Sequence, residues 1–217
     1  NGMQGILVQT DMSKKYAIVI CVVALGVATI AFQNSRSAFL SVRMPSPRPP
    51  QPSDIAEAAM NQIGKTVAYD ASYATLSYPG GDVPMRTGVC ADVVVRALRS
   101  ARNMDLQKLV HDDMSRNFSA YPNRWSLTKP DRNIDHRRVP NLERYFTRKG
   151  YSVLGSNFRS GDIVTVRLDR DRPHIMIVTN HGNEPWVVHN IGRGTKEENR
   201  LFEFKIVGHF RLPAKST

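Results

Sequence analysis

The stretch "MRTGVCADVVVRALRS", residues 85–100, places a cysteine directly before a helix-forming run. The turn-forming segment 78–88 ends just ahead of Cys90, which therefore lies at or just before the helix N-terminus. Free backbone N–H groups and the positive end of the helix dipole favour a thiolate at such a position. We expect one face of the helix to be buried, because apolar residues recur at helical spacing: Val93, Val94, Ala97 and Leu98.

Helices dominate the chain around this stretch, and strands follow it. Further helices are predicted after the N-cap Ser53, at 105–118, and at 141–150 with Gly150 as C-cap. Four β-rich segments separated by polar turns are then predicted to form one antiparallel meander: 161–169, 174–180, 185–191 and 201–212. Helices first and strands afterwards indicate an α+β domain with the helices packed against a C-terminal antiparallel sheet.

The N-terminal part of the chain predicts export. Residues 1–32 comprise a tail and the uncharged run 16–32, which follows Lys14 and Lys15 and is typical of a signal peptide or an uncleaved membrane anchor. The proline-rich segment 33–52 is predicted to be an extended linker. The folded domain would then occupy 53–217, in the periplasm or outside the cell, tethered to the inner membrane if the segment is not cleaved.

The formal net charge of +11 predicts attraction to polyanions, which include nucleic acids, anionic lipids and acidic cell-wall polymers. The sequence has no arginine-rich arm and no aromatic-basic RNA motif. We therefore expect no nucleic-acid partner.

The two cysteines lie in different predicted parts of the chain. Cys21 lies inside the apolar run, so the domain keeps Cys90 alone and has no internal disulfide. An unpaired thiol in an oxidising compartment is prone to oxidation, which favours a reactive role for Cys90. The alternative is a small buried hydrophobe without reactivity.

A general base for Cys90 is available on the predicted strands. His174 begins one strand, and His189 and Asn190 lie on the next. If the turn between them is residues 180–183, His174 faces His189, and if it is 180–184, His174 faces Asn190. We expect His189 to orient His174, with Asn190 as the alternative. Cysteine, imidazole and a polar residue in this chain order are typical of papain-type hydrolases.

Several motifs together resemble the bacterial family catalogued as domain of unknown function 1287, from about Ser53 to Leu212: "GVCADVVVRALR", "DLQKLVHDDM", "YPNRW", "DRNIDHRRVPNL", "GDIVTVRL", "HIMIV", "HNIG" and "IVGHFR". That family is grouped with the NlpC-type, papain-like cysteine peptidases, which cleave peptide stems of bacterial cell walls. The resemblance implies a papain-like fold with Cys90 as nucleophile, His174 as general base and His189 as orienting residue. It also implies peptidoglycan or a related peptide as substrate, and no metal or organic cofactor is required.

The loop "IDHRRVPNL" is a candidate substrate-binding wall. His136, Arg137 and Arg138 could face a groove in which the arginines bind carboxylates, and Trp125 could form its floor. The alternatives are a solvated loop with local ion pairs and a buried aromatic.

Two other functions stay open at this stage. One is a cell-wall-binding module without turnover, in which Cys90 is unreactive. The other is a metal-dependent hydrolase that uses a set of histidines, namely His111, His136, His174 and His189. For the first hypothesis, the sequence leaves open which peptide or amide bond would be cleaved.

Overall fold

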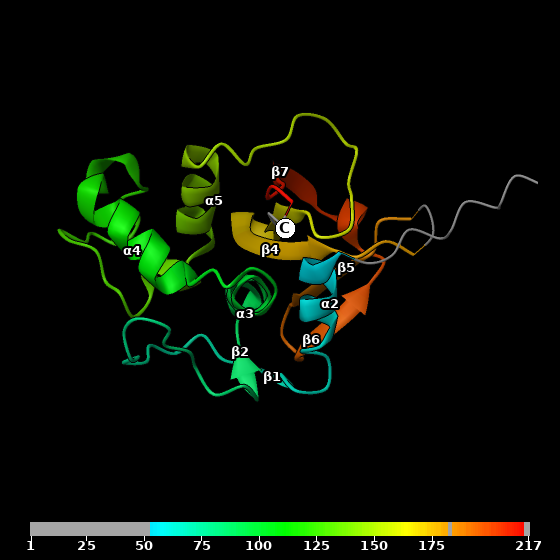
Figure 1. Cartoon of the computed structure of the whole chain (residues 1–217), viewed down its shortest axis with the longest axis horizontal. Helices are drawn as coiled ribbons and strands as arrows, with labels where there is room; N and C mark the ends of the chain where they lie inside the picture. The colour runs from blue at the N-terminus through cyan, green and yellow to red at the C-terminus, as the bar shows by residue number, and fades with distance from the viewer. Residues whose placement is uncertain (1–52, 182–183, 215–217) are drawn as a thin grey trace, which may run out of the picture. The chain divides into compact units, whose positions relative to one another are not determined.

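Helix α3 (Cys90–Arg102) lies at the centre of the computed structural model, which describes residues 53–181 and 184–214 (Figure 1). Every residue from Cys90 to Leu98 is buried, so the helix is enclosed on all sides along its first nine residues. The prediction of a helix at this place is confirmed. The prediction that it buries one face was too modest, because the sheet and the other helices surround it.

The three other predicted helices are present. Helix α2 (Asp54–Met60) begins after Ser53, whose hydroxyl accepts the backbone N–H of Ala56. Helix α4 (Leu106–Arg116) begins after Asp105, whose carboxylate accepts the N–H of Gln107. Helix α5 (Val139–Arg148) starts two residues earlier than predicted, because the fixed φ of Pro140 suits a first helical turn.

The sheet has five antiparallel strands in the order β6-β5-β4-β3-β7. They are β3 (Ile163–Leu168), β4 (Arg172–Val178), β5 (Val187–Asn190), β6 (Thr195–Glu198) and β7 (Lys205–Phe210). The α+β class is thereby confirmed. Strands β3 to β6 form a meander, whereas β7 returns to pair with β3, so the prediction of a single meander was wrong for the last strand.

Strand β6 was not predicted. Its sequence, Thr-Lys-Glu-Glu, has no apolar residue to mark a buried face. Pairing with β5 alone defines it as a strand. The last predicted strand segment was too long, since Leu201–Glu203 forms a 3-10 turn before β7.

The two faces of the sheet pack against different cores. On one face, Ile175 and Ile177 of β4 and Val188 of β5 pack in the same core as α3. On the other face, the alternate residues Met176 and Val178 belong to a smaller core that includes Leu201. Side chains along a strand alternate between faces, so this pattern assigns each strand residue to the α3 side or to the far side.

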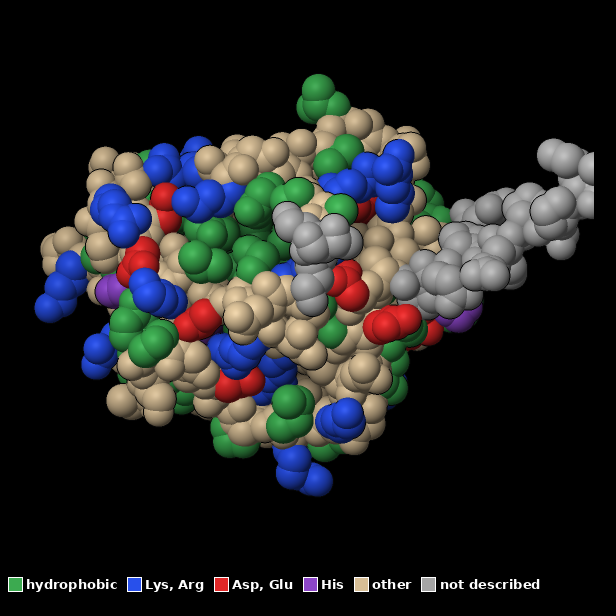
Figure 2. All heavy atoms as spheres, in the orientation of Figure 1, with side chains coloured by type: hydrophobic (Ala, Val, Ile, Leu, Met, Phe, Trp, Pro, Cys, Tyr) green, Lys and Arg blue, Asp and Glu red, His purple; other side chains and the backbone are tan. Residues whose placement is uncertain are grey.

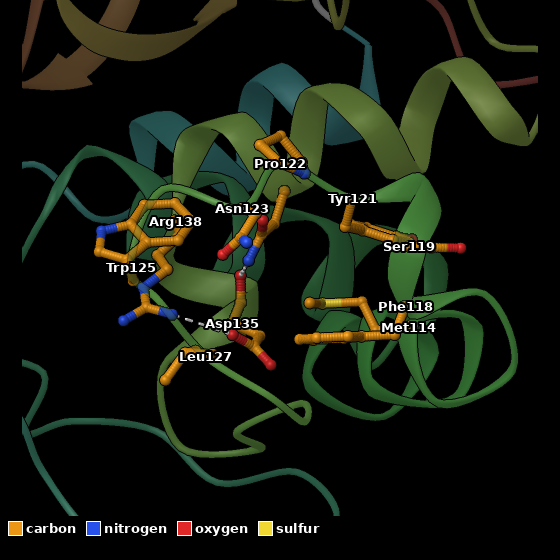
Figure 3. A pocket seen from close by; sticks show the side chains of 11 residues that line it. Met114, Phe118, Ser119, Tyr121, Pro122, Asn123, Trp125, Leu127, Asp135 and Arg138 are labelled. Atoms are coloured by element: carbon orange, nitrogen blue, oxygen red, sulfur yellow. Dashed lines mark hydrogen bonds and ion pairs between the residues drawn. The ribbon is translucent and has the colours of Figure 1, made fainter.

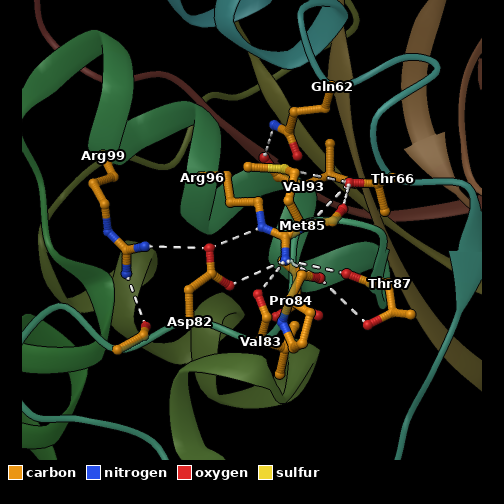
Figure 4. A network of polar contacts seen from close by, with 12 residues as sticks. Gln62, Thr66, Asp82, Val83, Pro84, Met85, Thr87, Val93, Arg96 and Arg99 are labelled. Atoms are coloured by element: carbon orange, nitrogen blue, oxygen red, sulfur yellow. Dashed lines mark hydrogen bonds and ion pairs between the residues drawn. The ribbon is translucent and has the colours of Figure 1, made fainter.

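A short parallel pair, β1 (Ala68–Tyr69) and β2 (Thr87–Gly88), leads directly into α3. Arg96 of α3 holds the segment between these strands (Figure 4): its guanidinium bonds both carboxylate oxygens of Asp82 and the carbonyl of Thr87. Gly88 allows the close approach, because a Cβ there would lie 3.0 Å from a carboxylate oxygen of Asp92. The residues just before Cys90 are therefore fixed from the helix side.

A buried ion pair connects the first turn of α3 to the segment before α5. Both oxygens of Asp92 accept from Arg137, at 2.9 Å from Nε and 3.0 Å from Nη2, and both side chains are almost fully buried. Asp92 also accepts the backbone N–H of Val89 at 2.6 Å, and Arg137 donates to the carbonyls of Asp70 and Ser72. Three separate segments thus meet at this pair.

On the face shown in Figure 2, Lys and Arg side chains are scattered, with Asp and Glu side chains between them. Among the described residues, no helix is long and apolar enough to span a membrane. The predicted signal or anchor segment 16–32, with Cys21, and the linker 33–52 lie outside the described residues.

Replacing Arg137 with leucine is expected to lower the free energy of unfolding by about 3–5 kcal/mol, because Asp92 would remain as a buried, unpaired charge. The measurement is urea unfolding followed by circular dichroism. The exposed Lys108–Asp112 pair supplies the control, since Lys108→Gln should leave the midpoint unchanged. A loss below about 1 kcal/mol for Arg137→Leu would contradict the role of the buried pair.

Candidate active site

Cys90 is the first residue of α3 and lines a groove of about 560 Å³. Aromatic residues Tyr69, Tyr73 and Trp125 share this groove with Arg138. Only 4% of Cys90 is exposed, so the thiol lies at the base of the groove. The predicted position of the cysteine at a helix N-terminus is confirmed.

Burial raises the pKa of the Cys90 thiol to about 11. The backbone amide of Ile175 on β4 opposes this change by hydrogen bonding to the sulfur, as do the amides of Ala91 and Cys90 itself, whereas the negative charge of Asp92 adds to it. Desolvation of the thiolate outweighs the favourable effect of the helix N-terminus. In the unliganded protein the thiol is therefore protonated at neutral pH.

His174 and His189 are hydrogen-bonded to each other, with 2.8 Å between His174 Nε2 and His189 Nδ1. Both predicted registers of the hairpin were wrong. Strand β4 pairs Ile177 with Val188, which leaves 180–185 as the connection and displaces His189 two residues from direct opposition to His174. A two-residue displacement keeps a side chain on its face, so the two histidines still meet, diagonally.

Glu198 of β6 extends this pair, because its Oε2 lies 2.8 Å from His189 Nε2. A carboxylate only accepts, so His189 carries its proton on Nε2 and accepts through Nδ1. His174 then donates through Nε2, which leaves His174 Nδ1 as an unprotonated acceptor. The three residues form a relay, Glu198–His189–His174, that determines the tautomer of His174.

The pKa of both histidines is lowered, so both rings are neutral at neutral pH. Burial is the main cause for His174, followed by the neighbouring His189, and its pKa falls to about 3. Burial also lowers the pKa of His189, against the opposing effect of the Glu198 hydrogen bond. A neutral His174 with a free Nδ1 lone pair has the protonation state of a general base.

No hydrogen bond joins the Cys90 thiol to the His174 ring, although the residue after His174 contacts the thiol. The amide that reaches the Cys90 sulfur belongs to Ile175, the residue after His174. Alternation along β4 points Ile175 toward α3 and places His174 on the face of Met176. His174 lines a separate cavity of about 260 Å³, the His174 cavity. Tyr69 and Pro173 line both this cavity and the Cys90 groove.

Asn190, the alternative partner for His174, has a different role. Its amide donates to the carbonyls of Gly88 and Ala68, at 2.9 and 3.2 Å. It therefore joins β5 to the β1–β2 pair directly before Cys90 and is not hydrogen-bonded to His174.

The predicted wall of the groove is only partly present. Arg138 and Trp125 line the groove, with the Arg138 guanidinium 4.0 Å from the Trp125 ring centroid. Arg137 also reaches it, but its guanidinium is committed to Asp92 and is not free to bind a substrate carboxylate. His136 is 2% exposed and does not line the groove, and burial lowers its pKa to about 4.

The four histidines considered for a metal site do not form one cluster, although His174 and His189 are hydrogen-bonded to each other. In residues 53–181 and 184–214, no three His, Cys, Asp or Glu side chains are grouped to hold a metal ion. His111 instead packs edge-on against Tyr78. The neighbouring carboxylates are engaged in ion pairs, Asp112 with Lys108 and Asp113 with Arg148.

Three important residues escaped sequence reasoning. Asp92 has no local sequence signal, and its partner Arg137 lies 45 residues away along the chain. Glu198 belongs to the unpredicted strand β6. Tyr69 lies beside Cys90, whose charge contributes to raising the pKa of Tyr69 to about 12 after the larger effect of burial.

Comparison with known proteins agrees with the motifs from which the family was inferred. Residues 56–212 match the family model described as "Domain of unknown function (DUF1287)". The chain belongs to the DUF1287 family. Among curated relatives, "Uncharacterized protein YijF" of Escherichia coli (strain K12) is 47% identical over 204 residues, covering 87% of this chain and 99% of the relative. The DUF1287 match includes every residue of the groove and of the relay.

Cys90 is expected to react slowly with iodoacetamide at neutral pH, because its raised pKa keeps the thiol protonated. In a Cys21→Ser background, which leaves Cys90 as the single cysteine, intact-mass spectrometry would follow alkylation between about pH 6 and pH 10. The rate should rise throughout this range, and at pH 7.5 it should be at least about tenfold below the rate of the urea-unfolded protein at the same pH. A plateau below about pH 8 would show a preformed thiolate instead.

Proposed function

We propose that this chain is an exported thiol hydrolase of papain-like, NlpC type that cleaves peptide or amide bonds in bacterial peptidoglycan stem peptides. The observation that carries the proposal is the relay Glu198–His189–His174, which leaves an acceptor nitrogen on the residue next to the one that contacts the Cys90 thiol. A general base needs a partner that determines its tautomer, and Glu198 acts on His174 in this way through His189.

The reaction proceeds through a thioester. His174 Nδ1 takes the proton from Cys90 Sγ as the sulfur attacks the substrate carbonyl carbon. The amine then leaves with that proton, and water, deprotonated by His174, hydrolyses the thioester and restores the thiol. Since thiol and imidazole are both neutral at rest, attack and proton transfer occur together, without a preformed ion pair.

The start of α3 supplies the donor for the tetrahedral intermediate. The N–H of Asp92 is already bonded to the carbonyl of Val89 at 3.1 Å. The N–H groups of Cys90 and Ala91 lie against the sulfur, and the developing oxyanion would accept from that of Cys90. Substrate binding has to bring His174 Nδ1 within hydrogen-bond reach of Sγ, around Tyr69 and Pro173.

The groove suits a peptide that carries carboxylates. Arg124 and Arg138 line it together with three aromatic side chains, which offer charge and flat apolar surface. Stem peptides carry carboxylates along a short backbone. The export signal predicted for residues 16–32 would deliver the domain to the compartment where such peptides occur.

The wall-binding module without turnover remains the competing proposal, and two observations favour it. The raised pKa of Cys90 and the lack of a described hydrogen bond between Cys90 and His174 fit an unreactive thiol. In that case the groove binds the peptide and leaves it intact.

Purified peptidoglycan incubated with the full-length chain tests the two proposals directly, with released fragments identified by mass spectrometry. We expect fragments from the parent protein and a loss of at least about 10³-fold in rate for Cys90→Ser. Sedimentation of protein with peptidoglycan measures binding in parallel. Retained binding without fragments from either protein would overturn the hydrolase proposal in favour of the binding module.

Replacing Glu198 with glutamine tests the relay. A glutamine amide can donate to His189 Nε2, which reverses both tautomers and places a proton on His174 Nδ1. We expect kcat to fall by about 10- to 100-fold with KM unchanged. The control is Glu197→Gln on the same strand, because Glu197 pairs with His181 outside the relay. Equal effects of the two substitutions would contradict the relay.

A further inference from the structure

A pocket of about 260 Å³ lies at the Glu198 end of the relay, and we call it the relay pocket. Its lining includes three cationic residues and one carboxylate, namely Arg193, Lys196, Arg200 and Glu198. Liquid water occupies about 30 Å³ per molecule, so the pocket has room for a small polar group but not for a polymer segment. Among the described residues, none lines both this pocket and the Cys90 groove. The reaction proposed above does not use its cationic residues.

The register of β5 and β6 brings Lys196 to the relay. Lys196 is directly opposite His189, and residues opposite each other in an antiparallel pair point to the same face of the sheet. Glu198, two residues further along β6, shares that face. The Lys196 side chain therefore lies on the same face as the imidazole whose tautomer Glu198 determines.

The turn between β5 and β6, which carries Arg193, is fixed against the segment before β1. Thr195 donates its backbone N–H to the carbonyl of Thr66 at 2.7 Å. Gly194 has a φ of +82°, and a Cβ there would lie 2.6 Å from the same carbonyl oxygen, so this position requires glycine. The wall of the relay pocket is therefore in place before any ligand binds.

Two of the three cations have no partner in the described part of the chain. The side chains of Arg193 and Lys196 form no hydrogen bond or ion pair with a described residue. Arg200 differs, because its Nε is 2.7 Å from an oxygen of Glu203 and its Nη1 is 3.8 Å from an oxygen of Glu198. Cations without a paired carboxylate attract an anion.

A second pocket, of about 290 Å³, shows a different arrangement (Figure 3). Trp125 and Arg138 line both this second pocket and the Cys90 groove. The Arg138 guanidinium is 4.0 Å from the Trp125 ring centroid and donates to Asp135 at 3.2 Å. Arg138 therefore has a carboxylate within hydrogen-bond distance, whereas no described carboxylate is paired with Arg193 or Lys196.

The charge of the relay pocket acts on the relay. Burial is the main cause of the low pKa of both His174 and His189, and the charge of Arg200 lowers the pKa further in both cases. The other charged groups that act on the pair are Arg172, which lowers the pKa of His174, and Glu198 and Glu203, which raise the pKa of His189. An anion bound beside Arg200 would offset its charge and favour protonation of the pair.

We propose that the relay pocket is an anion site that binds a carboxylate or a phosphate group through Arg193 and Lys196. The planar guanidinium of Arg193 can bind two oxygens of one anion, and the ammonium of Lys196 adds a compact charge. The binding is independent of the proposed hydrolase function, because none of the residues that line the Cys90 groove takes part. In a hydrolase, the bound anion would make His174 a stronger base.

Histidine-ring NMR of the full-length chain tests the site, because its six histidines give few signals and His189 lines the pocket. Inorganic phosphate and acetate are the probes, each titrated at neutral pH with chloride holding the ionic strength constant. We expect the ring signals of His189, assigned with His189→Gln, to shift with saturation and a dissociation constant of about 1–10 mM for at least one probe. Saturation by phosphate alone indicates a phosphate ligand, and saturation by acetate indicates a carboxylate ligand. No saturable shift with either probe would overturn the proposal.

A double variant locates the bound anion. Arg193→Gln with Lys196→Gln should raise the dissociation constant at least about tenfold, and the fold should be kept because both residues are exposed. Arg116→Gln with Lys129→Gln is the matched control, since it removes the same two charges from exposed positions outside the pocket. Equal losses in the two double variants would show general attraction by net charge and refute the site.

The effect on the relay is measured on the same ring signals. In saturating phosphate or acetate, His189 should titrate at a higher pH than in chloride, because a nearby negative charge favours the imidazolium. Arg193→Gln with Lys196→Gln should remove this change. An unchanged titration of the parent protein would refute the effect on the relay.

Anion binding and hydrolysis are separated by assaying the same proteins on peptidoglycan. Cleavage by a protein that binds neither probe refutes the anion site alone. Saturable binding by a protein that cleaves no peptidoglycan supports the anion site and refutes the hydrolase.

Discussion

The ion pair between Asp92 and Arg137 determines where Cys90 lies. Asp92 is two residues after the cysteine and accepts from the backbone just before it, so its position fixes the first turn of α3. Arg137 connects that turn to the segment that leads into α5 and to the backbone around Ser72. The pair also neutralises a carboxylate beside the thiol. Without Arg137, the charge of Asp92 would disfavour a thiolate more strongly than it does now.

The protonation state of the Cys90 thiol depends on two opposing effects at the start of α3, stabilisation of the thiolate by the helix N-terminus and its desolvation by burial. The helix N-terminus offers dipole and N–H groups that stabilise a thiolate, and the sequence alone led us to expect this effect to dominate. Complete burial of the first turn desolvates the sulfur, and that cost is larger. In a hydrolase, substrate binding would have to bring the two pKa values closer together, because an imidazole of pKa about 3 is a weak base for a thiol of pKa about 11. The same features in a binding module would leave an unreactive cysteine.

How much the sequence could predict depended on whether a feature is local. Capping residues and apolar spacing marked the four α-helices of the part of the chain that the structure describes. The approach of His174 to His189 was predicted although both registers were wrong, since only the face of the strand mattered. Strand β6, and Glu198 with it, carries no apolar pattern and is defined by pairing with β5. The Asp92–Arg137 pair joins residues 45 apart, which neither spacing nor composition could connect.

Chemistry and recognition rest on different parts of this fold. The relay lies on strands β4, β5 and β6, whereas Trp125, Arg138 and the second pocket belong to the helices and the loop between them. Pro173 of β4 and Tyr69 of β1 line both the Cys90 groove and the cavity that contains His174, so the two parts meet beside the thiol. Under the proposed function, a substitution in the loop would alter side-chain binding and leave the tautomer of His174 unchanged, because the hydrogen bonds of the relay join strand residues. In the proposed hydrolase, the sheet would supply the base and the loop would select the substrate.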